Sequence, residues 1–342
     1  MKTIDQASIE DSANIAVDLI IIGAGPVGLF GAYYAGCRGL SIAVIDALDE
    51  LGGQVNAMYP EKEIFDIAGF PAIRGRELIS SLIQQANQFQ PTYLCGERAE
   101  KLDVDSCPPG AAPFRIYCES GRQVTGRAVI ITGGIGAFTP RQLGVGEEFH
   151  GRGLAYFVQD PGTCAGQDVV IVGGGDSALD WALTLEPIAR SVTLVHRRDR
   201  FRAHESTVAA VRASSVRVVT GAEIVEVVGD EKVTGVRISR PDSDEHLACD
   251  RLVAALGFVA NLGPIRDWGI ELAGRRHIIV DSAMRTSVPG IFSAGDITEY
   301  DGKVRLIAVG FGEVATAVNN AAVFINPEAG LFPGHSTDTP PR

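Results

Sequence analysis

Residues 17–28 read VDLIIIGAGPVG, and residues 168–178 read DVVIVGGGDSA. In both stretches a run of apolar residues ends at closely spaced glycines. An unbroken apolar run is typical of a parallel strand buried on both faces, and the glycines favour a tight turn into a helix. Further apolar strands are predicted at residues 40–45 and 191–195, which completes two βαβ units. We therefore expect an α/β chain with two Rossmann-like nucleotide-binding domains.

The first loop, Gly23 to Gly28, fits the pattern GxGxxG. Its first glycine makes the turn, the second lets backbone N–H groups approach a pyrophosphate, and the third lets helix and strand pack closely. Asp46 follows 23 residues after Gly23, where a carboxylate can accept hydrogen bonds from a ribose. Because Asp46 would repel the 2′-phosphate of NADP, FAD or NAD is favoured; a purely structural glycine turn is the alternative. The expected cofactor contacts are Gly23, Gly25, Pro26, Gly28 and Asp46.

Three later features favour FAD over NAD at this first site. They are LGGQ at residues 51–54, TGGIG at residues 132–136 and GIFSAGD at residues 290–296. Asp296 follows a predicted strand and a glycine, where its carboxylate can bind the ribityl hydroxyls of a flavin; an ordinary turn aspartate is the alternative. A helix is predicted from Gly312 to Val323, and its positive N-terminal end would stabilise negative charge on a reduced flavin ring.

The second loop favours a different nucleotide. It fits GxGxxA and precedes a helix predicted at residues 177–189. His196 lies 23 residues after Gly173, so a basic residue occupies the position that Asp46 occupies after the first loop. Cationic groups at this position make charge-assisted bonds to a 2′-phosphate, which indicates NADPH; a solvated basic surface is the alternative. The expected contacts are Gly173, Gly175, Asp176, Ser177, His196, Arg197, Arg198 and Arg202.

The composition limits the classes of partner. Acidic residues outnumber basic ones by 42 to 30, and the net charge of −12 argues against nucleic acid. No unbroken apolar run is long enough to cross a bilayer, and residues 1–14 lack the charged and apolar regions of a signal peptide. We therefore expect a flexible leader at residues 1–16, no membrane association and a cytoplasmic protein. The six cysteines include no CxxC pair, so neither a dithiol motif nor a local zinc site is available and no metal is expected.

Several stretches together resemble the thioredoxin-reductase-like flavoproteins, and among them the bacterial (type 2) ferredoxin–NADP reductases. The likeness covers about residues 17–337, and its most specific stretches are YPEK, DWAL, VHRRDRFRAHE and the terminal HST. It implies a fold of the thioredoxin reductase type, with a discontinuous FAD-binding domain at residues 17–130 and 285–342 and an NADPH-binding domain at residues 131–284. Thioredoxin reductases carry a CxxC dithiol near the second glycine loop. Here that region holds only Cys164, which excludes the same disulfide chemistry.

The resemblance also implies roles for residues that no local motif marks. Gln54 and Tyr59 match flavin contacts, with Tyr59 stacked on one face of the isoalloxazine ring. His335 matches an aromatic side chain that a partner subunit places on the other face, so a homodimer is expected; a disordered tail histidine is the alternative. Tyr59, His335 and Ser336 are the candidate catalytic residues. The remaining matches are Ala99 and Phe138 at the adenine and linker region, and Ser336 and Thr337 near the ring edge.

The predicted reaction is electron transfer through FAD between NADPH and a one-electron carrier, ferredoxin or flavodoxin. NADPH would give a hydride to flavin N5, and the two electrons would then leave singly. Positioning of the two cofactors is the expected contribution of the protein. The alternatives are an NADPH oxidase or diaphorase that reduces oxygen, a quinone or free flavin, and an NADPH-sensing flavoprotein without fast turnover.

Overall fold

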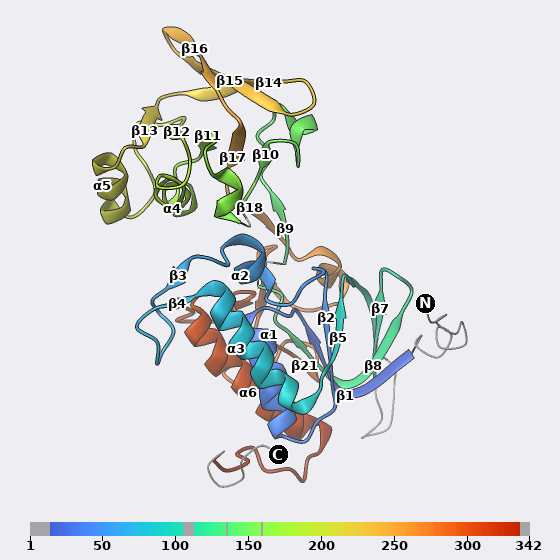
Figure 1. Ribbon diagram of the computed structural model, residues 1–342. Helices are drawn as coiled ribbons and strands as arrows, with labels where there is room; N and C mark the ends of the chain where they lie inside the picture. Colours follow the sequence, from blue (N-terminus) through green and yellow to red (C-terminus); the bar gives the residue numbers. More distant parts are fainter. Residues whose placement is uncertain (1–13, 105–112, 135, 159, 336–342) are drawn as a thin grey trace, which may run out of the picture. The chain divides into compact units, whose positions relative to one another are not determined.

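The computed structural model describes residues 14–104, 113–134, 136–158 and 160–335. The chain divides into two compact units (Figure 1). Unit 1 combines the chain up to Ala137 with the chain from Ala260 onward, and unit 2 comprises Phe138–Val259. The unit that contains the first glycine loop is therefore discontinuous in sequence.

Unit 1 is built on a seven-stranded sheet. Its strands are β1 (Asn14–Ile22), β2 (Ile42–Asp46), β5 (Thr92–Cys95), β6 (Ala99–Val104), β7 (Phe114–Cys118), β8 (Gln123–Ile131) and β21 (Ile291–Ser293). The strand order is β5-β2-β1-β8-β7-β6, and β21 pairs with β8. The neighbours β5, β2, β1, β8 and β21 are parallel, whereas β7 and β6 pair antiparallel. Leu19, Ile20 and Ile21 of β1 are fully buried, as the unbroken apolar run predicts.

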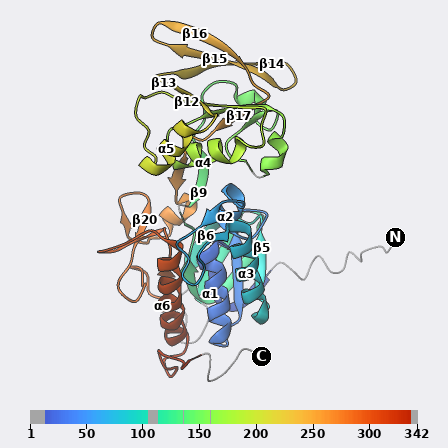
Figure 2. The same ribbon diagram turned by 60° about the vertical axis from the view of Figure 1, so that its left-hand side comes forward.

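Three long helices belong to this unit: α1 (Pro26–Cys37), α3 (Gly75–Ala86) and α6 (Ile307–Ile325). α1 packs between α3 and α6 (Figures 1 and 2). Among the described residues, one helix, α6, is long and apolar enough by length and composition to cross a membrane. Its Val314, Ala317 and Val318 are fully buried in the core of unit 1. Core packing therefore accounts for the apolar character of α6, because a packed core helix meets the same length and composition test.

Shorter elements complete unit 1. They are α2 (Gly53–Met58), β3 (Glu63–Ile64), β4 (Ile73–Arg74), β19 (Leu272–Ala273), β20 (His277–Ile279), β22 (Thr298–Glu299) and the 3₁₀ helices η3 (Asn87–Phe89) and η6 (Gly263–Asp267). α2 begins directly after Gly52, whose φ of +114° lies in the left-handed region that glycine tolerates. The described part of the tail, from residue 326 to 335, contains no helix or strand.

Unit 2 is built on a five-stranded parallel sheet with the order β10-β17-β11-β12-β13. These strands are β10 (Leu154–Ala155), β11 (Asp168–Val172), β12 (Ser191–His196), β13 (Arg217–Thr220) and β17 (Arg251–Ala254). A separate antiparallel sheet holds β14 (Glu223–Gly229), β15 (Val233–Arg240) and β16 (Ser243–Ala248). The helices are α4 (Asp176–Leu185), α5 (Glu205–Ala213) and the 3₁₀ helices η4 (Glu147–Phe149) and η5 (Pro161–Cys164).

Alternate residues of β11 face two different cores. Val170 and Val172 pack in a cluster with residues of β14 and β15, whereas Val169 and Ile171 pack in a cluster with residues of α4. Successive side chains of a strand point to opposite faces, so the strand must be apolar throughout. Unit 2 therefore has three layers: the antiparallel sheet, the parallel sheet and the helices (Figure 2).

The boundaries of the units differ from the predicted domain boundaries. β1 begins at Asn14, inside the predicted leader 1–16, because its first residues pair with β8. Residues 131–137 and 260–284, which the sequence analysis placed in the second domain, group with unit 1. Leu262, Ile265 and Trp268 explain the second difference, since all three are buried in the core of unit 1. The two segments that connect the units, β9 (Ala137–Pro140) and β18 (Phe258–Asn261), pair with each other.

Two helices also differ from their predicted bounds. α4 ends at Leu185 rather than at residue 189, because Pro187 has no backbone N–H with which to continue the helical hydrogen bonds. α6 begins at Ile307 rather than at Gly312. Its added first turn is held by packing, since Ile307 and Phe311 contact the cluster formed with α2 and α3. α6 therefore starts five residues earlier than predicted, directly after its cap residue Leu306.

Candidate cofactor sites

The first glycine loop lies where four parallel strands end. β1 ends at Ile22, β2 at Asp46, β8 at Ile131 and β21 at Ser293. Because these strands are neighbours in one sheet, the residues after them gather at one edge. Ligands of open α/β sheets bind at this carboxyl edge. The structure thus brings together the three segments that the sequence analysis associated with FAD.

The glycines of this loop have distinct environments. Gly23 has a φ of +110°, and a Cβ there would lie 2.7 Å from the carbonyl oxygen of Thr132. A Cβ at Gly28 would lie 1.9 Å from the Gly23 carbonyl oxygen, so neither position accepts a side chain. A Cβ at Gly25, in contrast, would meet no atom within 4 Å, and Pro26 opens α1 directly after it. This open face beside a helix N-terminus fits a dinucleotide pyrophosphate.

Asp46 holds the same loop. One carboxylate oxygen accepts a hydrogen bond from the backbone N–H of Ala24 at 2.5 Å, and the other accepts one from Leu48 at 2.8 Å. Burial raises the pKa of Asp46, and these two N–H donors oppose that rise. Each carboxylate oxygen has further acceptor capacity, so the role predicted for Asp46 at a ribose is compatible with its contacts.

Gln54 and Tyr59 lie on either end of α2. A Cβ built on Gly134 would lie 2.7 Å from Nε2 of Gln54, so the Gln54 amide rests against the loop after β8. Burial raises the pKa of Tyr59 to about 12, with further contributions from the charges of Asp296 and Asp66. Tyr59 and Asp296 are therefore close enough to interact electrostatically. The structure gathers Gln54, Tyr59 and Asp296 at one edge of unit 1.

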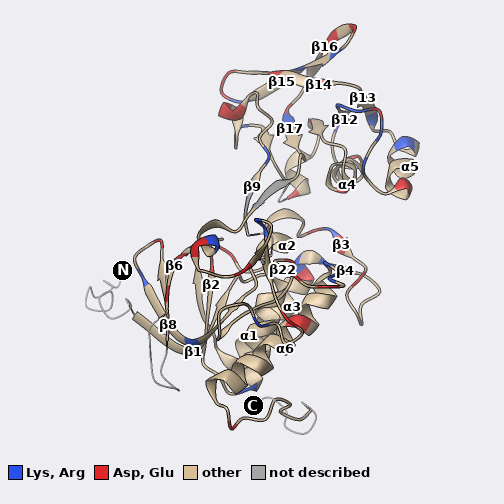
Figure 3. Cartoon of the chain, turned by 180° about the vertical axis from the view of Figure 1, so that it is seen from behind, with Lys and Arg blue, Asp and Glu red and all other residues tan. Residues whose placement is uncertain are grey.

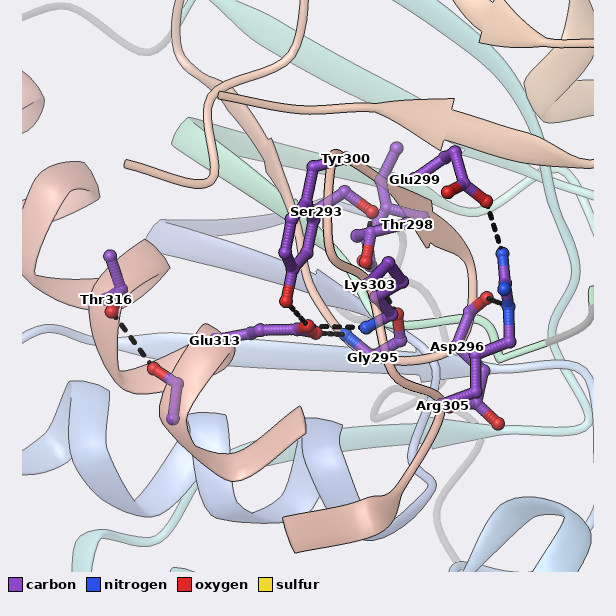
Figure 4. A network of polar contacts seen from close by, with 12 residues as sticks. Ser293, Gly295, Asp296, Thr298, Glu299, Tyr300, Lys303, Arg305, Glu313 and Thr316 are labelled. Atoms are coloured by element: carbon purple, nitrogen blue, oxygen red, sulfur yellow. Dashed lines mark hydrogen bonds and ion pairs between the residues drawn. The ribbon is translucent and has the colours of Figure 1, made fainter. Parts of the chain in front are cut away.

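A buried polar network holds the turn that carries Asp296 (Figure 4). Glu313 of α6 accepts hydrogen bonds from the Gly295 N–H at 2.7 Å and from the Tyr300 hydroxyl at 2.6 Å, and it forms an ion pair with Lys303. Burial raises the pKa of Asp296, and the charge of Lys303 opposes this effect. Neither Glu313 nor Lys303 was predicted from the sequence. The available signal was a single acidic residue in the otherwise uncharged segment 307–325.

Two further residues predicted at the FAD site, Ala99 and His335, lie elsewhere in unit 1. Ala99 is buried in β6 as part of the core, and only 6% of its surface is exposed. His335 is exposed in the C-terminal segment, with its ring edge-on to Phe332 at 5.2 Å. The side chain of Phe138 and the whole of Ser336 and Thr337 lie outside the part of the chain that the structure describes. The roles implied for all five residues remain predictions.

The second glycine loop repeats the geometry of the first. A Cβ at Gly173 would lie 2.5 Å from the carbonyl oxygen of Ala255, so this position needs glycine. A Cβ at Gly175 would meet no atom within 4 Å, and α4 starts at the next residue. An open glycine again lies at a helix N-terminus, which fits a second dinucleotide.

Two backbone contacts connect this loop to the arginine-rich segment 196–204. The backbone N–H of Arg202 donates to the Gly174 carbonyl oxygen at 2.7 Å. The carboxylate of Asp176 accepts a hydrogen bond from the His204 N–H at 2.9 Å. Ser177, in the first turn of α4, is exposed. Asp176 thus orients the arginine-rich segment 196–204, a role that the spacing of the motif did not predict.

The position of His196 corrects one expectation. Its ring stacks on Phe201 at 5.2 Å and lies against Gly174, where a Cβ would be 2.1 Å from His196 Cε1. Burial lowers the pKa of His196, and the nearby arginines lower it further. The protonated form of this imidazole is therefore disfavoured, and His196 is a weaker source of positive charge than the arginines that follow it.

The positive charge comes from the residues that follow His196. Arg197, Arg198 and Arg202 are all exposed on the segment after β12, which is blue in Figure 3. Among the described residues, none of these three guanidinium groups forms an ion pair with a carboxylate. They are therefore available to an anionic ligand, and the predicted 2′-phosphate contact rests on them.

No disulfide joins the cysteines that the structure describes. Cys164 is fully buried in unit 2, and the five cysteines within the described ranges are all free. In the same part of the chain, no cluster of three or more His, Cys, Asp or Glu side chains could hold a metal ion.

Comparison with known proteins agrees with this geometry. Residues 17–321 match the pyridine nucleotide-disulphide oxidoreductase family. The ferredoxin–NADP reductases of Salinispora arenicola and Salinispora tropica are 61% and 60% identical to this chain, and each alignment covers 94% of the chain and 98% of the relative. The crystal structure of T. acidophilum thioredoxin reductase matches with a TM-score of 0.75 and 28% identity, over 90% of this chain and 98% of that one. The chain therefore belongs to the pyridine nucleotide-disulphide oxidoreductases and, within them, to the ferredoxin–NADP reductases with the thioredoxin reductase fold.

Proposed function

We propose that this chain transfers electrons between NADPH and ferredoxin or flavodoxin, with FAD bound in unit 1 and NADPH bound in unit 2. One observation carries the proposal: each unit presents an open glycine at a helix N-terminus, one loop supported by the carboxylate of Asp46 and the other by exposed arginines. The absence of a CxxC pair removes an internal disulfide as electron acceptor. We therefore expect the electrons to pass to a soluble carrier protein, and the names of the relatives agree with this expectation.

The chain contributes binding and orientation. Bound FAD supplies the redox chemistry, because it takes up two electrons together and can give them up singly. Gly25 leaves room for the pyrophosphate of FAD, and Asp46 holds the loop in place by accepting a hydrogen bond from the Ala24 N–H. We expect Gln54 and Tyr59 to contact the flavin ring, and Tyr59 stays protonated because burial raises its pKa to about 12. A neutral phenol adds no charge beside the ring.

Helix α6 is suited to stabilise a reduced flavin. Its N-terminal end at Leu306 follows closely after the Asp296 turn, and the helix has 19 residues. The first N–H groups of a helix carry a partial positive charge, which favours a nearby anion. We assign this role to residues 307–310, the true first turn of α6, in place of the predicted start at Gly312.

The same proposal includes a cytoplasmic homodimer that is not attached to a membrane. The C-terminal segment supports the dimer, since Leu331 and Phe332 are 55% and 65% exposed directly before His335. Large exposed apolar side chains beside an expected flavin-stacking residue are suited to bind a second subunit. Light scattering at several protein concentrations tests this part, and a monomer at all of them would refute it.

Anaerobic stopped-flow spectroscopy tests the electron transfer. The protein is mixed with NADPH or NADH and then with oxidised ferredoxin or flavodoxin, while flavin absorbance and carrier absorbance are recorded. We expect fast bleaching with NADPH, slower bleaching with NADH, and rapid carrier reduction. Bleaching followed only by reaction with oxygen or quinone would favour the oxidase or diaphorase alternative. No bleaching at all would refute the proposed function.

A further inference from the structure

Unit 1 contains an ion pair that is almost completely withdrawn from solvent. The side chain of Lys303 is 1% exposed and that of Glu313 is 5% exposed. Glu313 accepts from three donors: the Gly295 N–H, the Tyr300 hydroxyl and the Lys303 ammonium group. Other ion pairs among the described residues involve side chains of greater exposure, such as Asp18 and Arg127 at 29% each. The Lys303–Glu313 pair is therefore an exception that needs a reason.

Both members of the pair bind the same residue, Gly295 (Figure 4). Glu313 takes the Gly295 N–H at 2.7 Å, and Lys303 donates to the Gly295 carbonyl oxygen at 3.0 Å. The same carbonyl oxygen also accepts from the Thr298 hydroxyl at 2.8 Å. Gly295 has a φ of +85°, which requires glycine, and Asp296 follows it. Contacts to both the N–H and the carbonyl oxygen of Gly295 thus fix the backbone orientation with which Asp296 follows the turn.

Stability alone is a weak explanation for this arrangement. Transfer of two charges from water into a protein interior is costly, and a buried ion pair is often no better than apolar residues of the same volume. What the pair does provide is geometry. Glu313 belongs to α6 and Lys303 to the loop before it, so the pair joins the Gly295 turn to the helix in one rigid unit.

We propose that Glu313 and Lys303 are positioning residues that hold the Asp296 carboxylate and the N-terminal end of α6 in fixed relation to the flavin. This inference rests on the proposed binding of FAD in unit 1. Tyr300 supports the pair, because its hydroxyl donates to Glu313 at 2.6 Å. Neither Glu313 nor Lys303 needs to contact the cofactor. They act through the Gly295 peptide and through the helix.

The test uses three variants of the full chain: Glu313→Gln, Lys303→Met and the double variant. Each single change leaves one buried charge without its partner, whereas the double variant leaves none. Tyr300→Phe is a milder fourth variant that keeps the ion pair and serves if a single variant fails to fold. Arg127→Met is the matched control, because Arg127 forms an ion pair with Asp18 in β1 of the same sheet, away from the carboxyl edge.

Three quantities are measured: the dissociation constant of FAD from the reconstituted apoprotein, the midpoint potential of bound FAD, and the melting temperature of the apoprotein. We expect the double variant to recover much of the stability lost in the single variants. Its FAD dissociation constant should nevertheless rise at least about tenfold, which corresponds to about 1.4 kcal/mol. The midpoint potential of the double variant should fall, since a displaced helix end stabilises the reduced ring less.

The outcomes separate three explanations. A purely structural pair would lower the melting temperature and leave the FAD dissociation constant and potential of the double variant at wild-type values, which would overturn the proposal. A direct charge effect on the flavin would shift the potential in opposite directions in the two single variants and leave the double variant unchanged, which would also overturn it. If the unmodified chain fails to bind FAD, the proposed function fails first. Normal FAD binding by Arg127→Met is required for the positive result.

Discussion

The two open glycines allow the cofactor assignment to be tested one unit at a time. Gly25 has a φ of −70° and Gly175 a φ of −101°, which are ordinary values for alanine, and neither Cβ would meet an atom within 4 Å. Gly25→Ala and Gly175→Ala should therefore change the stability of the apoprotein by no more than about 1 kcal/mol. A bound pyrophosphate would meet the added methyl group. We expect the effect of each substitution to fall on one ligand alone.

The size of the effect follows from the bonds that the methyl group displaces. Charge-assisted hydrogen bonds from backbone N–H groups to phosphate contribute about 1.5–3 kcal/mol each, so the loss of one raises a dissociation constant about 10-fold to 150-fold. Gly25→Ala should weaken FAD binding by this factor and leave NADP⁺ binding unchanged. Gly175→Ala should do the reverse. Gly28→Ala is the contrasting control, because its Cβ would lie 1.9 Å from the Gly23 carbonyl oxygen and should destabilise the fold itself.

Two titrations measure the outcome. Quenching of FAD fluorescence by apoprotein gives the FAD dissociation constant, and isothermal calorimetry of the FAD-loaded protein gives that of NADP⁺. If Gly25→Ala weakened NADP⁺ binding, or Gly175→Ala released FAD, the assignment of the loops would be wrong. If both variants bound both ligands normally, neither loop would hold a pyrophosphate.

Three further predictions concern unit 2. Arg198→Ala should raise the KM for NADPH about 10-fold to 100-fold and leave the KM for NADH unchanged, because only NADPH carries the 2′-phosphate; equal effects on both would refute this contact. His196→Gln should leave the preference for NADPH nearly unchanged, since the protonated form of the imidazole is disfavoured. The pKa of His196 is lowered in the folded chain, so the unfolded chain binds this proton more tightly and the free energy of unfolding falls as the pH drops below about 6.5. In urea unfolding at several pH values, His196→Gln should lose less stability at acidic pH than the unmodified chain. An unchanged dependence of the free energy of unfolding on pH would contradict this prediction. Cys164→Ser should retain carrier reduction in stopped-flow measurements, whereas its loss would mean that a thiol takes part in the reaction.

Local sequence was sufficient where one stretch of chain determines the structure. The strand–glycine–helix pattern predicted both nucleotide loops, since the need for glycine at Gly23 and Gly173 arises from the loop and its neighbouring strands. Burial on both faces of β11 was likewise evident from its unbroken apolar residues. Net charge and the lack of CxxC are properties of composition and spacing, so they required no structure.

Only the tertiary structure decided how distant segments meet. Glu313 and Lys303 became recognisable as a pair because α6 folds back onto the Gly295 turn, and nothing in the local pattern specifies that contact. His196 had the right spacing for a cationic contact, but its ring stacks on Phe201 and partial burial lowers its pKa, which disfavours the charged form. Segment 260–284 joins unit 1 because Trp268 and its neighbours fill that core. Side-chain charge and domain membership depend on burial, and burial depends on contacts across the whole chain.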